Sequence, residues 1–203
     1  MADKILMNKN TLASLKKELA EYNTALPVFE MKEQQLKEEV RIVENNINRI
    51  EESMIATNEE VKNWIAVMAE DIAGLNELVS IDRIITRKRE IAGVTVVVFE
   101  DIEFEDTEID LFNTPLWVDA ASEVVRDQKM NFSILQIERR NLELLSEEWA
   151  EARRMKNALQ EVFIPETMEN IRKIEIYLGD VERLAIGCAK LVKKKKEENK
   201  ATA

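Results

Sequence analysis

The side chains able to do chemistry in this chain are almost all carboxylates and amines. There are 40 Asp and Glu against 29 Lys and Arg, one cysteine and no histidine. Imidazole acid–base catalysis and His-ligated metal sites are therefore excluded. The four glycines, at positions 74, 93, 179 and 187, form no phosphate-binding loop. Because the carboxylates lie on expected helix surfaces, where solvated i,i+4 pairing is their ordinary role, we expect no enzyme, no metal and no cofactor.

Composition narrows the class of protein further. The net charge of −11 over 203 residues argues against nucleic acid as a partner. A single cysteine, Cys188, cannot form a disulfide framework. Residues 1–10 do not resemble a signal peptide, and no apolar run approaches the ~18 residues of a membrane span. We expect a cytosolic protein that does not insert into a membrane, although its partner can be membrane-bound.

A heptad repeat organises the first third of the chain. Counting in sevens from Leu12 and from Leu15 gives two series of seam positions, interrupted only by Glu33 and Thr57. The series are Leu12, Leu19, Leu26, Glu33, Val40, Ile47, Met54, Val61, Met68 and Leu75, and Leu15, Tyr22, Phe29, Leu36, Val43, Ile50, Thr57 and Trp64. This repeat predicts a coiled-coil helix roughly 100 Å long, and hence a rod.

The ends of this first helix are marked by local signals. Asn10 or Thr11 is the expected N-cap, because its side-chain oxygen can accept a backbone N–H. Pro27 lies inside the repeat, which continues in phase on both sides, so we expect a kink and not an end. Gly74 and Ser80 are the expected exit signals.

An insert with a different period follows. Val94, Val96, Val98, Ile102 and Phe104 recur with a period of two, and most are β-branched. Gly93 falls where a turn would separate them from an Ile-rich arm at 81–89. This pattern predicts a β-hairpin. Two strands alone are marginally stable in water, so the hairpin should pack on the helices or on a partner. We expect it to lie outside the core of the coiled coil.

The charges of the insert are segregated. The first arm holds the basic residues Arg83, Arg87, Lys88 and Arg89, and the second holds only acidic ones. One interpretation is a solvated edge that resists strand-to-strand aggregation. The other is a docking surface for a basic partner.

A second helical pattern runs from Trp117 to about Lys196. Its apolar stripe comprises Leu142, Leu145, Trp149, Ala152, Leu159 and Phe163, then Ile171, Ile174, Leu178, Val181, Ala185, Cys188 and Val192. The two halves are out of phase across Pro165, which predicts a kink or local unwinding there. Ala185, Gly187, Cys188 and Ala189 should form a slim end beside the start of the first helix, with Cys188 buried on the seam.

These elements predict a mainly α-helical fold. It is a long antiparallel two-helix coiled coil with a small β-hairpin insert between the helices, because a short connection makes the helices antiparallel neighbours. The expected parts are a first helix at 1–80, an insert at 81–116 and a second helix at 117–203. Both termini should then lie at one end.

Several segments resemble one family, the D subunits of the V/A-type (vacuolar/archaeal-type) ATPases. The first helix opens with the similar run Leu12, Leu15, Lys16 and Leu19, and Ile91–Val94 and Thr114–Asp119 are similar to a bacterial branch. A more specific motif lies near the end of the chain. It comprises Arg154, Asn157, Ala158, Leu159, Ile164, Pro165, Glu182 and Arg183. The family's Lys-Arg-Asp is not kept, since Glu33 follows Lys32.

The resemblance implies the central-stalk rotor shaft of a rotary, ion-pumping ATPase, without catalytic groups of its own. It implies as partners the catalytic A and B subunits of the head, the small F subunit of the stalk and a funnel-shaped C/d subunit above the membrane rotor ring. The expected location is cytoplasmic, peripheral to the membrane through this complex. A stand-alone antiparallel coiled-coil scaffold or tether is the alternative.

The resemblance also implies where the head would bind. The expected head-interface residues are Leu12, Leu15, Lys16, Leu19, Gly187, Lys190, Lys193 and Lys194. They come from the two chain ends that should meet at the tip of the coiled coil. For the run Lys193–Lys196, a solvated and frayed helix end is the alternative interpretation.

Overall fold

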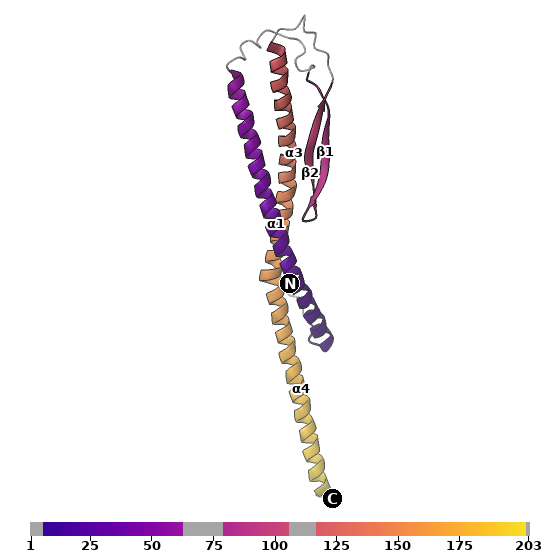
Figure 1. The fold of residues 1–203 in the computed structure, drawn as a ribbon. Coiled ribbons are helices and arrows are strands. Elements are labelled where there is room, and N and C mark those ends of the chain that lie inside the picture. The colour runs from indigo at the N-terminus through magenta and orange to yellow at the C-terminus, as the bar shows by residue number, and fades with distance from the viewer. Residues whose placement is uncertain (1–5, 63–78, 106–116, 202–203) are drawn as a thin grey trace. The chain divides into compact units, whose positions relative to one another are not determined.

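The computed structural model describes residues 6–62, 79–105 and 117–201 (Figure 1). In chain order the elements are helix α1 (Lys9–Lys62), strands β1 (Ile81–Ile91) and β2 (Val94–Phe104), helix α3 (Trp117–Ala158), a π-helical turn (Leu159–Phe163) and helix α4 (Ile164–Ala201). They form two compact units. The hairpin unit is Lys32–Glu151, and the terminal unit joins the residues up to Met31 to those from Ala152 onward.

Helix α1 begins one or two residues before its expected cap. The side-chain oxygen of Asn8 accepts the backbone N–H of Thr11 at 2.7 Å, and the helix starts at Lys9. The predicted cap at Asn10 or Thr11 is wrong, because both residues lie inside the helix. The helix continues through Pro27, as the unbroken heptad phase predicted.

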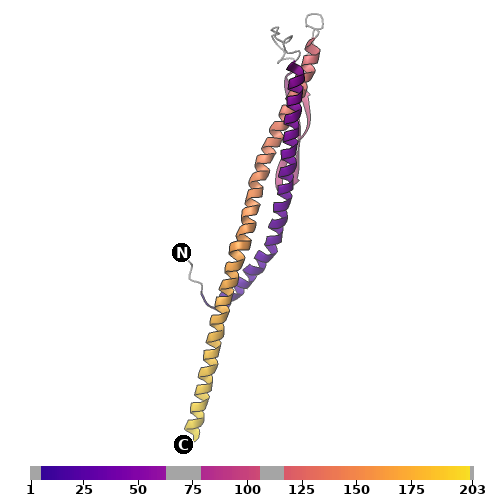
Figure 2. The ribbon, with the colours of Figure 1, turned by 90° about the vertical axis from the view of Figure 1, so that its left-hand side faces the viewer.

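The burial of α1 follows the heptads. Every seam position from Leu12 to Val61 is half-buried or buried. Burial is deepest in the hairpin unit, at Leu36, Val40, Val43 and Ile47. There α1 and α3 run side by side (Figure 1 and Figure 2). The repeat therefore marks the packed face, as predicted, while Trp64, Met68, Gly74 and Leu75 lie outside the described residues.

Ion pairs show that the helices are antiparallel within each unit. In the terminal unit Lys9 pairs with Glu182 at 3.5 Å and Lys16 with Glu175 at 2.6 Å. In the hairpin unit the pairs are Lys32 with Glu148 at 3.0 Å and Glu51 with Arg139 at 2.8 Å. Residue numbers rise along α1 while those of the partners fall, which confirms the predicted antiparallel pairing.

The β-hairpin is also confirmed. Strands β1 and β2 pair antiparallel from Ile91 opposite Val94 down to Ile81 opposite Phe104. The two turn residues have positive φ, 50° at Ala92 and 85° at Gly93, which matches the right-handed twist of the strands. The Glu105 N–H donates to the Ser80 carbonyl at 2.9 Å and closes the open end.

Strand β2 contributes to the core of its unit. Val94, Val96 and Ile102 are buried, whereas no residue of β1 is fully buried. A groove under the hairpin is lined by Val43 of α1 and Leu145 of α3 together with Val96 and Val98. The hairpin therefore packs on the helices, as expected. The prediction that it lies outside the core is wrong for β2, whose alternating apolar face is covered by both helices.

The unwinding expected near Pro165 is a π-helical turn. The backbone N–H of Ile164 donates to the carbonyl of Leu159, five residues earlier. Upstream, the buried residues Leu145, Ala152 and Leu159 are spaced by seven, but the next buried residue is Thr167, eight positions on. The wide turn thus absorbs one extra residue and restores the phase. Phe163, expected in the stripe, is 40% exposed because it lies within this turn.

The C-terminal part of α4 differs from the prediction. Ile171 and Ile174 are buried and Leu178 is half-buried, but every residue from Val181 to Glu197 is exposed. The slim end therefore does not lie beside the start of α1, and Cys188 is exposed. The physical reason is register: α1 begins at Lys9, opposite Glu182, so α4 runs on past the described part of α1.

Candidate interaction surfaces

A single amide side chain fixes the hairpin to α3. The Oδ1 of Asn141 accepts the backbone N–H of Val97 at 3.0 Å, and its Nδ2 donates to the carbonyl of Val97 at 2.7 Å. Asn141 is 5% exposed. Because both backbone groups of Val97 are paired with one buried side chain, α3 satisfies the edge of β2 that β1 does not cover.

A half-buried carboxylate lies beside this contact. Burial raises the pKa of Glu138 above its ordinary value, while hydrogen bonds with Asn141 and Asn46 act in the opposite direction. Glu138 and Asn141 line the groove under the hairpin, together with the ion pair between Glu39 and Arg89 at 3.4 Å. The underside of the hairpin is therefore a polar network set among apolar residues.

The open end of the hairpin is fastened separately. The ammonium group of Lys129 donates to the carbonyl of Val79 at 2.6 Å. The guanidinium of Arg126 lies 5.7 Å from the ring centroid of Phe104, within cation–π range. With Asn141 in the middle and Glu39 near the turn, α1 and α3 hold the hairpin along its length.

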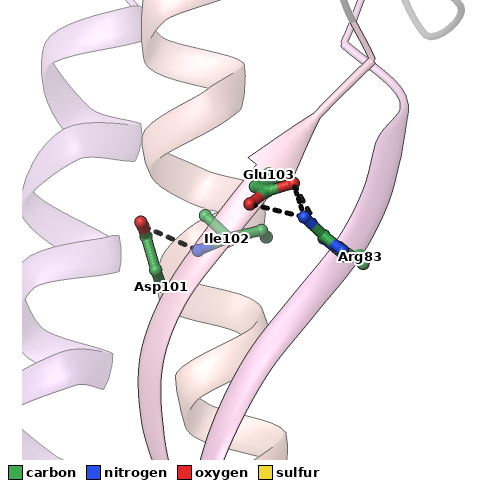
Figure 3. Close-up of polar contacts among 4 residues, drawn as sticks. All are labelled: Arg83, Asp101, Ile102 and Glu103. Atoms are coloured by element: carbon green, nitrogen blue, oxygen red, sulfur yellow. Dashed lines mark hydrogen bonds and ion pairs between the residues drawn. The ribbon is translucent and has the colours of Figure 1, made fainter.

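The segregated charges of the hairpin pair across its strands. Arg83 makes two hydrogen bonds to the carboxylate of Glu103, at 2.8 and 3.0 Å (Figure 3). Arg87 pairs with Glu100 at 3.1 Å. All four side chains are substantially exposed. This arrangement favours the interpretation of a solvated, charge-guarded edge over that of a docking surface for a basic partner.

The expected head-interface residues fall into two groups that the structure does not bring together. Leu12, Leu15 and Leu19 are half-buried on the seam of α1 and are available only in part, and Lys16 pairs with Glu175. The second group, Gly187, Lys190, Lys193 and Lys194, lies beyond Glu182 on the exposed part of α4.

The exposed part of α4 is apolar as well as basic. Leu184 is 69% exposed and Leu191 63%, and Val181 and Val192 are also exposed. Sequence reasoning assigned Val181 and Val192 to the buried seam and missed Leu184 and Leu191. The available signal was that Leu184 and Leu191 lie three or four residues from the predicted seam positions Val181 and Cys188, on the same side of the helix.

The π-helical turn lies within the C-terminal motif. Leu159 is buried at its start, Asn157, Ala158 and Ile164 are half-buried around it, and Arg154 and Pro165 are exposed.

In the turn, the ring of Phe163 stacks on Tyr22 of α1 with centroids 5.7 Å apart. The Tyr22 hydroxyl donates to Glu18 at 2.6 Å, and this bond raises the pKa of Tyr22. Further along, Glu182 and Arg183 are exposed and pair with Lys9 and Asp180.

No metal centre or membrane span is found in the described part of the chain. No three His, Cys, Asp or Glu side chains there are grouped so that they could hold a metal ion. None of the described helices is both long enough and apolar enough to cross a membrane.

Comparison with known proteins identifies the family. The family model for the D subunit of ATP synthase matches residues 11–194. The chain belongs to the ATP synthase D-subunit family. It is 32% identical over 192 residues to the V-type ATP synthase D subunit of Borreliella burgdorferi, covering 94% of each chain. It is 26% identical to the protein of the same name from Chlamydia trachomatis serovar L2, over 98% of this chain and 100% of that one.

The D-subunit family match spans α1, the hairpin, α3 and the π-helical turn, and most of α4. The resemblance drawn from the N-terminal leucines and from the Asn157–Pro165 motif is thus confirmed, including its bacterial branch. Asn141, by contrast, was not expected to matter. Its only signal was a polar residue next to Leu142 in an apolar stripe, which a helical pattern alone does not distinguish from a solvated position.

Proposed function

We propose that this chain is the central-stalk rotor shaft of a V/A-type rotary ATPase, which couples ATP hydrolysis or synthesis in the catalytic head to ion translocation by the membrane rotor ring. The proposal rests on the match to the D-subunit family along almost the whole chain. The antiparallel helices supply a stiff element. A stand-alone scaffold or tether would not require the motif around the π-helical turn.

The proposed partners follow from the same family. The catalytic A and B subunits of the head would surround the exposed end of α4, and the small F subunit and a funnel-shaped C/d subunit would bind the remainder. The chain itself would be non-catalytic, cytoplasmic and peripheral to the membrane through the complex. The net negative charge of the chain argues against nucleic acid as a partner, because contacts with phosphate groups need basic surface.

In the proposed mechanism, the shaft makes different contacts with each catalytic interface and carries out no chemical step itself. At each angle, α4 would present different side chains to each catalytic interface, so one interface is favoured in the closed state. The exposed apolar residues Leu184 and Leu191 would bury area inside the ring, while Lys193–Lys196 would add charge contacts. These contacts gain strength where a ring excludes solvent.

The test is reconstitution of the head with three forms of the full chain. Truncation after Val192 should weaken head binding and coupled ATP turnover. Replacement of Lys193–Lys196 by glutamine removes the four charges but keeps the length of the helix. Comparing this form with the truncated one separates the effect of charge on head binding from the effect of helix length. Wild-type binding should fall as added salt shortens the Debye length below ~8 Å, and the glutamine form should respond less.

One outcome would count against the role of the lysine run, and another against the shaft itself. If the truncated chain binds the head as tightly as the full chain, the lysine run is only a solvated helix end. If the intact, folded chain binds no head at all, the tether interpretation is favoured.

A further inference from the structure

The exposed part of α4 carries an apolar face of defined width. Val181, Leu184, Cys188 and Leu191 follow one another at spacings of three, four and three, and Ala185 and Val192 adjoin them. At 100° per residue these six positions fall within about 120° of the helix surface, which is the width of a core-facing stripe. Ile186 is 58% exposed but lies on the opposite face.

Charge is distributed unevenly along this same segment. Asp180 and Glu182 stand at its beginning, with side chains 57% and 66% exposed. Its end carries Lys190 and the run Lys193–Lys196. The acidic residues already pair with Arg183 and Lys9 at 3.2 and 3.5 Å, yet remain open to solvent. With Arg183 included, the beginning of the segment has a net charge of −1. The end, residues 190–198, has a net charge of +3, since Glu197 and Glu198 follow the lysine run and Glu197 pairs with Lys193 at 4.0 Å. The middle is apolar.

We propose that in the free chain this apolar face is covered by the same face of a second copy, with the two α4 helices antiparallel. In that orientation the lysine run of each copy lies near Asp180 and Glu182 of the other. A parallel pair would instead place the two lysine runs against each other, which is unfavourable. Coiled-coil layering would set Val181 opposite Val192 and Ala185 opposite Cys188.

The association is expected to be weak and reversible. Some four turns of helix on each side bury less than the ~1,000 Å² typical of stable interfaces, and each chain carries a charge of −11. The inference goes beyond the proposed shaft function. It concerns the chain before assembly, and because the head would enclose the same residues, self-association and head binding would be mutually exclusive.

Sedimentation velocity of the full chain over a range of concentrations tests the proposal. The wild type should show a concentration-dependent monomer–dimer equilibrium. The double variant Leu184→Asp and Leu191→Asp should weaken dimerisation at least tenfold, and Ile186→Asp should leave it unchanged. A wild-type chain that stays monomeric at all concentrations, or equal effects of the two variants, would overturn the proposal.

Orientation is tested with one spin label per chain. In the variant Cys188→Ser with Lys196→Cys, labels in an antiparallel dimer should lie roughly 25 to 30 Å apart along the helix axis, since each label is about nine residues from the centre. A parallel dimer would bring them much closer and contradict the proposal. Enclosure by a ring would make Ile186→Asp weaken head binding without affecting the dimer, so the two proposals can fail separately.

Discussion

At the scale of single residues, Asn141 carries the clearest structural role. Replacing it with alanine would leave the N–H and the carbonyl of Val97 without their partner under the hairpin. We expect Asn141→Ala to lower the free energy of unfolding of the hairpin unit by about 2 kcal/mol. Urea denaturation measures this loss, and hydrogen exchange at the Val97 amide should accelerate.

Asn131 offers a matched control on the same helix. It is half-buried in a neighbouring groove and is not bonded to the hairpin. Asn131→Ala should therefore change stability by less than ~0.5 kcal/mol. Equal losses for the two variants would mean that the Asn141 contact adds nothing specific.

Glu138 should make stability depend on pH. Because its pKa is raised in the folded protein, the folded state binds more protons than the unfolded state just above the ordinary carboxyl pKa. Stability therefore falls as pH rises through that window. The ionisable side chains that face Glu138 across the adjoining grooves are Arg89, Glu39 and Arg49. Glu138→Gln should be more stable than the wild type at neutral pH, with the difference vanishing in acid.

Melting temperatures from pH 3 to 8 would measure this effect. Glu169 is the control, because its ion pair with Lys173 lowers its pKa. The contribution of Glu169 therefore has the opposite sign and is lost as pH falls. A Glu138→Gln variant with the wild-type pH profile would show that burial of this carboxylate has no energetic consequence.

At the scale of elements, the π-helical turn can be tested by deletion. Removing Gln160, an exposed residue in the turn, should let an ordinary helix join Leu159 to Thr167 with both on the packed face. Pro165 would then sit in a regular helix at a cost of ~3 kcal/mol. Combining the deletion with Pro165→Ala should restore stability to near the wild-type value, measured by thermal unfolding.

The control for this deletion is a regular segment of α4. Removing the exposed residue Arg172 should rotate Ile174 and Leu178 off the packed face by about 100° and destabilise the terminal unit strongly. If removing Gln160 is as damaging as removing Arg172, even with Pro165→Ala, the turn does not serve to restore phase.

The hairpin turn allows a stabilising change. Ala92 has φ of 50°, a conformation that costs residues with a Cβ about 1 kcal/mol and suits asparagine better. We expect Ala92→Asn to stabilise the hairpin unit by about 0.5 kcal/mol. Gly93→Ala should destabilise it by a similar or larger amount, because φ is 85° there. No atom lies within 4 Å of an added Cβ, so the loss would come from backbone strain and not from a clash. Chemical denaturation of both variants checks the opposite signs.

At the scale of the whole molecule, the heptad repeat predicts an extended particle. A compact domain of 203 residues would have a radius of gyration of about 17 Å. Small-angle scattering of the dilute, monomeric chain should give a much larger value. A compact result would contradict the prediction of two long helices forming a rod.

Periodicity was sufficient to predict much of the fold. The 3.5-residue repeat specified which residues of α1 are buried, because a helical seam has the same spacing wherever its partner lies. The alternation of residues 94–104 specified β2 for the same reason, and the phase shift at Pro165 specified where the helix unwinds. These are properties of one element at a time, so one sequence determines them.

Tertiary structure decided what each periodic face meets. Val181, Ala185 and Cys188 continue the buried stripe of α4 in sequence, but they are exposed because α1 begins opposite Glu182 and leaves them uncovered. Asn141 looks like an ordinary polar residue until β2 lies against it. The register and packing between elements that are distant in sequence depend on many contacts at once. A local sequence pattern therefore does not specify them.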